Sequence, residues 1–109
     1  MFLMPSKYEP CGLNQMYSLR YGTIPIVRAT GGLADTICEY KSGKGNGFLF
    51  EKYEPTAMLA AIKRAIKLYK NREEWVQLVR AAMNYDFSWE VSSKKYVDLY
   101  RSLIKKEKA

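Results

Sequence analysis

Residues 2–14 read FLMPSKYEPCGLN, and this stretch decides the fold of the 109-residue chain. The short apolar run at 2–4 ends at a Pro-Ser pair, which fits a parallel strand buried on both faces. A loop follows, and helical spacing then predicts a helix over 12–21. Gly22 stands where a helix favours a left-handed residue beyond its end. The stretch therefore predicts a strand, a loop and a helix.

The same alternation continues outward from this stretch. The elements expected next are a strand at 24–27, a turn at 30–32, a helix at 33–39, a glycine-rich loop at 41–47 and a strand at 48–50. Strand, helix, strand, helix and strand in this order are typical of a parallel sheet with helices packed on its faces. The predicted class is α/β, as part of a Rossmann-like domain.

The rest of the chain is predicted to be helical. Pro55 fits the first position of a helix, and Asn71 with Glu74 resembles a capping box for the next one. Ser88 can cap a last helix, whose basic tail at 105–108 is expected to fray. We treat the chain as a single unit, with a strand-helix-strand part at 1–54 and C-terminal helices at 55–109.

Charge and composition limit the possible functions. The net charge is +7, and 12 of the 18 Lys and Arg residues lie in 63–108. Nucleic acid is one possible partner for such a surface, but acidic residues alternate with these bases, so a solvated helical face is favoured. The chain has no His, which removes the commonest general base and any Ser-His or Cys-His machinery. Its two cysteines, Cys11 and Cys38, are expected to be free thiols.

The sequence shows no targeting or membrane signal. The apolar start at 1–5 lacks a basic leader, and no apolar run approaches the roughly 20 residues that a membrane helix needs. We therefore expect a cytoplasmic protein without a membrane partner.

Two turns that leave strands are the candidate sites for chemistry. In an open parallel sheet, ligands bind beyond the carboxyl ends of the strands. In the first turn, a helix that starts at Gly12 would offer the free N–H groups of Leu13 and Asn14 to a phosphate. Glu9 could accept hydrogen bonds from sugar hydroxyls. A lone glutamate is more often a surface carboxylate, so the residues alone leave both interpretations open.

The second turn contains Thr30, Gly31 and Gly32. Two glycines without Cβ atoms let the backbone approach a ligand closely. The more common role of a Gly-Gly pair after a strand is to form the turn itself, and the residues alone do not exclude it.

The stretches 4–15 (MPSKYEPCGLNQ) and 19–36 (LRYGTIPIVRATGGLADT) resemble the donor-sugar region of bacterial glycogen synthases and plant starch synthases. The sequence DFSW at 86–89 resembles the end region of that family, so the similarity covers nearly the whole chain. The resemblance implies the GT-B fold, in which two Rossmann-like domains enclose the active site. It also implies glucosyl transfer with retention from ADP-glucose or UDP-glucose to an α-1,4-glucan, without a metal or cofactor.

The resemblance also implies roles for individual residues. Glu9 would bind the donor glucose, with Cys11 and Gly12 lining it, and Leu13 and Asn14 would bind the diphosphate. The residues Thr30, Gly31 and Gly32 would shape the neighbouring turn. Many relatives in the wider superfamily have a second glutamate eight positions after the first, but Tyr17 stands there, which favours the glycogen synthases and leaves the ribose contact unassigned.

The family's N-terminal domain and the Arg and Lys that neutralise the departing diphosphate are missing from this sequence. We therefore expect a C-terminal fragment that is inactive alone and that forms a homo-oligomer through a bare strand at 2–4 and an apolar stripe on the last helix. The alternatives are a standalone module that binds nucleotide-sugars or phosphates, and a basic helical protein that binds nucleic acid.

Overall fold

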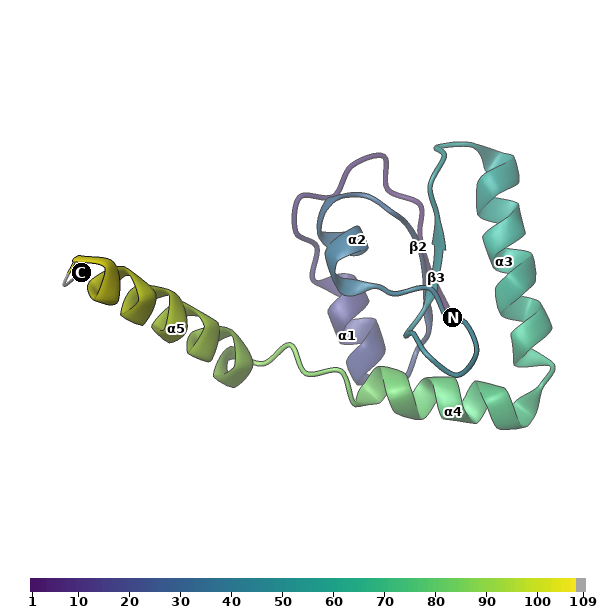
Figure 1. Ribbon diagram of the computed structural model, residues 1–109. Coiled ribbons are helices and arrows are strands. Elements are labelled where there is room, and N and C mark those ends of the chain that lie inside the picture. The colour runs from purple at the N-terminus through teal and green to yellow at the C-terminus, as the bar shows by residue number, and fades with distance from the viewer. Residues whose placement is uncertain (108–109) are drawn as a thin grey trace.

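The computed structural model describes residues 1–107, and at its centre lies a three-stranded parallel sheet in the order β1, β2, β3 (Figure 1). The strands are β1 (Phe2–Met4), β2 (Pro25–Arg28) and β3 (Phe48–Phe50). The helices are α1 (Asn14–Arg20), α2 (Gly31–Thr36), α3 (Pro55–Tyr69), α4 (Arg72–Met83) and α5 (Trp89–Glu107). The prediction of an α/β fold with a short parallel sheet flanked by helices is confirmed.

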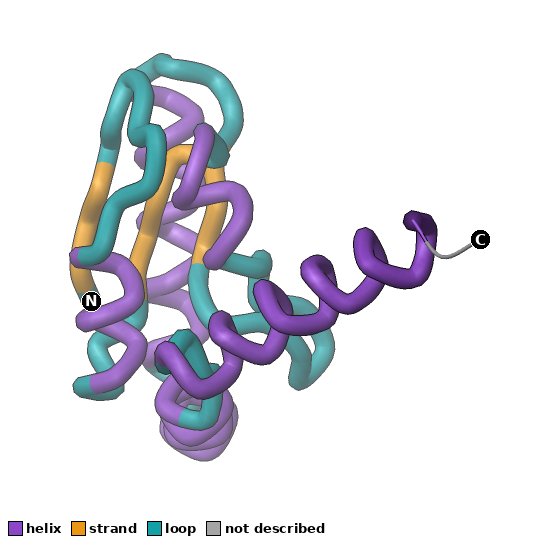
Figure 2. The backbone as a smooth tube through the Cα atoms, turned by 90° about the vertical axis from the view of Figure 1, so that its left-hand side faces the viewer, coloured by secondary structure: helices purple, strands orange, loops and turns teal. Residues whose placement is uncertain are grey.

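The three strands run side by side in register. Ile26 in the central strand pairs with Leu3 on one side and with Phe48 on the other. Because the strands are parallel, their carboxyl ends meet at one edge of the sheet, and the turns that follow them lie there together (Figure 2). This edge places the loop after β1 next to the start of α2.

Helices cover the sheet and enclose the core. Helix α1 packs against β1 and β2, α3 packs against β2 and β3, and α4 runs across the ends of both helices (Figure 1). The buried hydrophobic residues are Met4, Leu19, Ile24, Ile26, Val27, Leu33, Ile37, Phe48, Phe50, Ala61, Ala65, Leu78 and Ala82. None of the helices described for residues 1–107 combines the length and the apolar character that crossing a bilayer requires.

The two outer strands of the sheet, β3 and β1, differ in how their free lateral edges are covered. On the β3 side, Glu39 accepts the N–H of Leu49 at 2.6 Å, and Arg64 donates to the carbonyl of the same residue at 2.6 Å. Glu39 and Arg64 also form an ion pair at 3.0 Å, so both backbone groups of Leu49 are satisfied by side chains. On the β1 side, no strand within residues 1–107 covers the edge, and Phe2 and Leu3 are 38% and 40% exposed.

Helix α5 leaves the body of the molecule and projects into solvent (Figure 1). Seven of its large apolar side chains are exposed: Trp89, Tyr96, Val97, Leu99, Tyr100, Leu103 and Ile104. The stripe predicted from the sequence is therefore uncovered within residues 1–107. Hydrogen bonding from Ser88, just before the helix, lowers the pKa of the Asp86 carboxyl. Residues 105–107 are helical, the fraying expected at 105–108 stays a prediction, and Lys108 lies outside the described residues.

Helix α1 differs from its prediction in both start and orientation. It begins at Asn14 rather than at residue 12, because Gly12 has a φ of +67° and holds the chain outside the helical region. The helical spacing that predicted this helix is that of Leu13, Met16 and Tyr17. Its buried residues are instead Gln15, Ser18 and Leu19. The predicted C-terminal glycine is confirmed, since Gly22 has a φ of +72°.

Helix α2 also differs from its prediction. The expected turn at 30–32 and helix at 33–39 are wrong in their bounds, because Gly31 and Gly32 form the first turn of a helix that ends at Thr36. The side chain of Asn46 explains this end: it accepts the N–H of Cys38 at 2.7 Å and donates to the carbonyl of Thr36 at 3.1 Å. These bonds replace those that a longer helix would make.

The N-terminus of α4 provides a test of local stability. Asn71 caps this helix by accepting the N–H of Glu74 at 3.3 Å. The other half of the predicted capping box is wrong, because the N–H of Asn71 donates to the carbonyl of Leu68 at 2.9 Å and not to Glu74. Asn71→Ala should lower the free energy of unfolding by about 1 kcal/mol, and thermal unfolding followed by circular dichroism measures this. Asn84→Ala at the other end of α4, where the side chain makes no hydrogen bond within residues 1–107, is the control. Equal losses for the two variants would contradict the capping role.

Candidate functional site

The loop after β1 and the first turn of α2 lie backbone against backbone. The N–H of Gly32 donates to the carbonyl of Glu9 at 2.9 Å. A Cβ built on Gly31 would lie 2.0 Å from the Glu9 oxygen, and one on Gly32 would lie 1.8 Å from the oxygen of Cys11. The close approach that these two glycines permit is therefore to the loop itself. Their predicted role in shaping a donor site stays a prediction.

Glu9 is half-buried at this edge of the sheet. Its Oε2 accepts a hydrogen bond from the hydroxyl of Ser6 at 3.2 Å. Its other carboxylate oxygen takes no hydrogen bond or ion pair within residues 1–107. A carboxylate with free lone pairs beside an open turn can accept hydrogen bonds from ligand hydroxyls.

The residues after Glu9 carry three consecutive backbone N–H groups, those of Gly12, Leu13 and Asn14. Gly12 is left-handed with a φ of +67°, and Leu13 is right-handed with φ −117° and ψ −23°. A left-handed residue followed by a right-handed one is typical of a nest, a backbone turn whose successive N–H groups can face one anion. We use the name nest for the N–H groups of Gly12, Leu13 and Asn14. None of these three N–H groups bonds to an acceptor within residues 1–107. Because α1 begins at Asn14, the donors of Gly12 and Leu13 belong to the loop, and only that of Asn14 belongs to the helix.

Three contacts hold this loop in place. Arg28 donates from Nη1 to the carbonyl of Lys7 at 2.5 Å, and its guanidinium lies 5.5 Å from the centre of the Tyr53 ring. The second contact is the Gly32 N–H described above. The third is Gln15, whose Nε2 lies 3.3 Å and 3.0 Å from the carbonyl oxygens at positions 11 and 12. The backbone of the site is therefore fixed by neighbouring elements before any ligand binds.

The sequence interpretation missed Gln15 and its partner Thr36. The signal that could have found Gln15 is its spacing, because it lies four residues before the buried Leu19 and so on the same helix face. No local pattern connects it to Thr36, which is 21 positions away and receives a 3.2 Å hydrogen bond from it. That contact depends on the packing of α1 against α2.

The other predicted site residues face different surfaces. Cys11 and Leu13 line a groove of about 610 Å³ shared with the start of α5, where Lys95 is the charged residue. The side chain of Asn14 lines another hollow, next to Tyr17. Only the backbone of Asn14 therefore belongs to the nest. Among the side chains of residues 1–105, no three of His, Cys, Asp or Glu gather closely enough to hold a metal ion.

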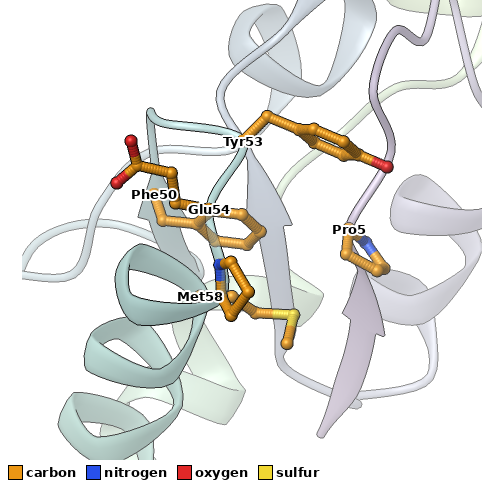
Figure 3. Close-up of a pocket in the computed structure, with 6 residues that line it drawn as sticks. Pro5, Phe50, Tyr53, Glu54 and Met58 are labelled. Carbon is orange, nitrogen blue, oxygen red and sulfur yellow. The ribbon is translucent and has the colours of Figure 1, made fainter.

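A further hollow lies at the carboxyl end of the sheet, next to the residues that follow β3 (Figure 3). It measures about 280 Å³ and is lined by Pro5, Phe50, Tyr53, Glu54, Pro55 and Met58. Its walls are mostly apolar, and Tyr53, which reaches toward Pro5, also contacts Arg28. The hollow is suited to a flat or apolar group and was not expected from the sequence.

Comparison with known families and relatives shows consistent similarity. Residues 1–81 match the family model described as glycosyl transferases group 1. The chain is 60% identical to a glycogen synthase of Fervidobacterium nodosum, over 93% of this chain and 21% of that protein. It is 58% identical to a glycogen synthase of Desulforudis audaxviator, over 97% of this chain and 22% of that protein. The chain thus spans about a fifth of the length of these relatives.

Solved structures show the same similarity in three dimensions. The catalytic domain of starch synthase IV from Arabidopsis thaliana, bound to ADP and acarbose, superposes with a TM-score of 0.83 at 41% identity. The match covers 94% of this chain and 22% of that one. A sucrose-phosphate synthase from Thermosynechococcus elongatus superposes with a TM-score of 0.66 at 28% identity, over 94% of this chain and 25% of that one.

Proposed function

This chain belongs to the glycosyl transferases group 1, and from that premise we propose that it supplies half of a nucleotide-sugar donor site. The whole reaction we propose is glucosyl transfer, with retention, from ADP-glucose or UDP-glucose to an α-1,4-glucan. The observation that carries the proposal is the free backbone nest beside Glu9, in a chain that is 60% identical to a glycogen synthase. The cytoplasmic location expected from the sequence stays a prediction.

In this proposal each part of the loop has a chemical role. The carboxylate of Glu9 accepts hydrogen bonds from glucose hydroxyls. The N–H groups of Gly12, Leu13 and Asn14 donate to the diphosphate, whose negative charge suits a cluster of free donors. The turn at Thr30, Gly31 and Gly32 holds the backbone of the loop through the hydrogen bond from the Gly32 N–H to the carbonyl of Glu9.

Binding of the donor to the isolated chain tests this assignment. We expect ADP-glucose or UDP-glucose at millimolar concentration to shift the backbone amide resonances of Gly12, Leu13 and Asn14 in the ¹⁵N-labelled chain. The resonances of Ile26 and Val27, which are buried in the central strand, should stay in place. If neither donor shifts the loop resonances, the donor-site assignment is wrong.

We predict that the isolated chain does not synthesise glucan. The cations that neutralise the departing diphosphate are, by resemblance to the family, supplied from outside this sequence, and stabilisation of the leaving group is a main electrostatic contribution to such transfer. Incorporation of radiolabelled glucose into glycogen from either donor should equal that of a Glu9→Ala control. Incorporation above this control would contradict the prediction.

We also propose that the isolated chain forms a two-fold pair. The open edge of β1 is a template for another strand, and the exposed stripe of α5 favours association. Light scattering coupled to size exclusion should give the mass of a dimer, and Leu3→Lys, which places a charge on the edge, should shift the equilibrium toward monomer. A monomer at every concentration of the unsubstituted chain would contradict the pairing.

A further inference from the structure

Gln15 is a fully buried polar side chain, and its hydrogen bonds are made by Nε2 and not by Oε1. Its exposed fraction is 0%. The two N–H bonds of Nε2 face three acceptors, the carbonyls of Cys11 and Gly12 and the hydroxyl of Thr36, so one N–H is shared between two of them. The Thr36 hydroxyl in turn donates to the carbonyl of Gly32 at 2.7 Å. Oε1 is buried and has no partner within residues 1–107. All the hydrogen bonds of the amide within the described residues are therefore made by its donor side.

The bonds to two consecutive carbonyls determine how the loop presents its N–H groups. A trans peptide is planar, so its C=O and N–H point in opposite directions. The carbonyl of Cys11 shares a plane with the N–H of Gly12, and the carbonyl of Gly12 shares one with the N–H of Leu13. Since Gln15 holds both carbonyls toward the interior, both N–H groups point away from it, to the side where they have no acceptor.

The same side chain is packed against the rest of the site. A Cβ built on Gly12 would lie 2.9 Å from Gln15 Oε1 and 2.9 Å from Glu9 Cγ. A shift of the Gln15 amide would therefore disturb both the nest and the Glu9 carboxylate. Side chains without a donor, such as Leu or Met, would leave the two carbonyls without their partner.

We propose that Gln15 is the positioning residue of the donor site, because it turns the N–H groups of Gly12 and Leu13 outward toward the diphosphate of a nucleotide-sugar. Gln15 does not touch the donor and acts only through the two peptide planes. The part of this inference that concerns the donor rests on the proposed function. The part that concerns the orientation of the N–H groups stands on the hydrogen bonds alone.

The test compares Gln15→Leu and Gln15→Met in the full 109-residue chain. Met has nearly the length and shape of Gln, carries no charge and has no N–H or O–H donor, so it covers the case in which the leucine variant does not fold. Residual dipolar couplings of the amide N–H bonds, measured without ligand at neutral pH, report their orientation. We expect changed couplings at Gly12 and Leu13 and unchanged couplings at Ile26 in both variants. The affinity for ADP-glucose should fall by about tenfold or more.

Gln77 provides the matched control, because it is the other glutamine of the chain and is exposed on α4. Gln77→Leu and Gln77→Met should leave the couplings at Gly12 and Leu13 and the affinity for ADP-glucose unchanged. Couplings in the Gln15 variants that coincide with those of the unsubstituted chain would overturn the positioning role. A failure of ADP-glucose to shift any resonance of the unsubstituted chain would instead overturn the proposed function, and the couplings would still decide the orientation.

Discussion

Gly32→Ala should lower the free energy of unfolding by about 3 kcal/mol, because the added methyl group would collide with the backbone of the loop after β1. The new Cβ would lie 1.8 Å from the backbone oxygen of Cys11 and 2.7 Å from its Cα. The obstacle is backbone rather than the end of a flexible side chain, so the loop or α2 has to move. Thermal unfolding should show a midpoint lower by on the order of 10 °C.

Gly43→Ala separates this clash from the general effect of adding a methyl group to a glycine. Gly43 has a φ of +81° and nothing within 4 Å of its Cβ position, so the substitution costs backbone strain alone, about 1 kcal/mol. If Gly32→Ala were no more destabilising than Gly43→Ala, the contact between the loop and α2 would be looser than described.

Glu9→Ala should reduce glucosyl transfer about 10- to 150-fold in a complete synthase in which this chain replaces the matching segment of a relative. The estimate takes about 1.5–3 kcal/mol for a lost hydrogen bond to a charged group, at about 1.4 kcal/mol for each factor of ten. The fold should be retained, because Glu9 is only half-buried and the bond from Gly32 is to its backbone oxygen. Initial rates with ADP-glucose and glycogen, together with circular dichroism, measure both.

Glu51→Ala is the matched control for this substitution. Glu51 is an exposed glutamate at the carboxyl end of β3, on the same edge of the sheet. It makes no ion pair within residues 1–107, so its loss should leave the rate unchanged. A Glu9→Ala enzyme as active as the Glu51→Ala enzyme would remove Glu9 from the donor site.

The parts of the fold that the sequence predicted well are those with strong local signals. The strands at 2–4 and 48–50 have the predicted bounds, because short apolar runs flanked by Pro or Gly leave little freedom in placing a strand. The starts of α3 at Pro55 and of α4 after Asn71 also follow from residues next to those positions. These signals act within a few residues of the chain.

The parts that were missed depend on contacts between distant residues. The carbonyls of the loop after β1 are held by Gln15, which is held by Thr36, and this arrangement decides which face of α1 is buried. Whether Gly31 and Gly32 face a ligand or another turn of chain depends on where the loop after β1 lies. The nest could be located only from the backbone angles of Gly12 and Leu13.

The side chains of Glu39 and Arg64, which bond to the backbone of Leu49, limit how many copies of this chain can join by pairing their strands. A fibril grows only if each added sheet presents a fresh edge to the next. Glu39 and Arg64 occupy both backbone groups of Leu49, so the outer edge of β3 is closed to an incoming strand. Two chains that meet through β1 consequently leave only closed edges outside. Growth along the sheet terminates at two copies, and an oligomer of higher order has to form through other surfaces.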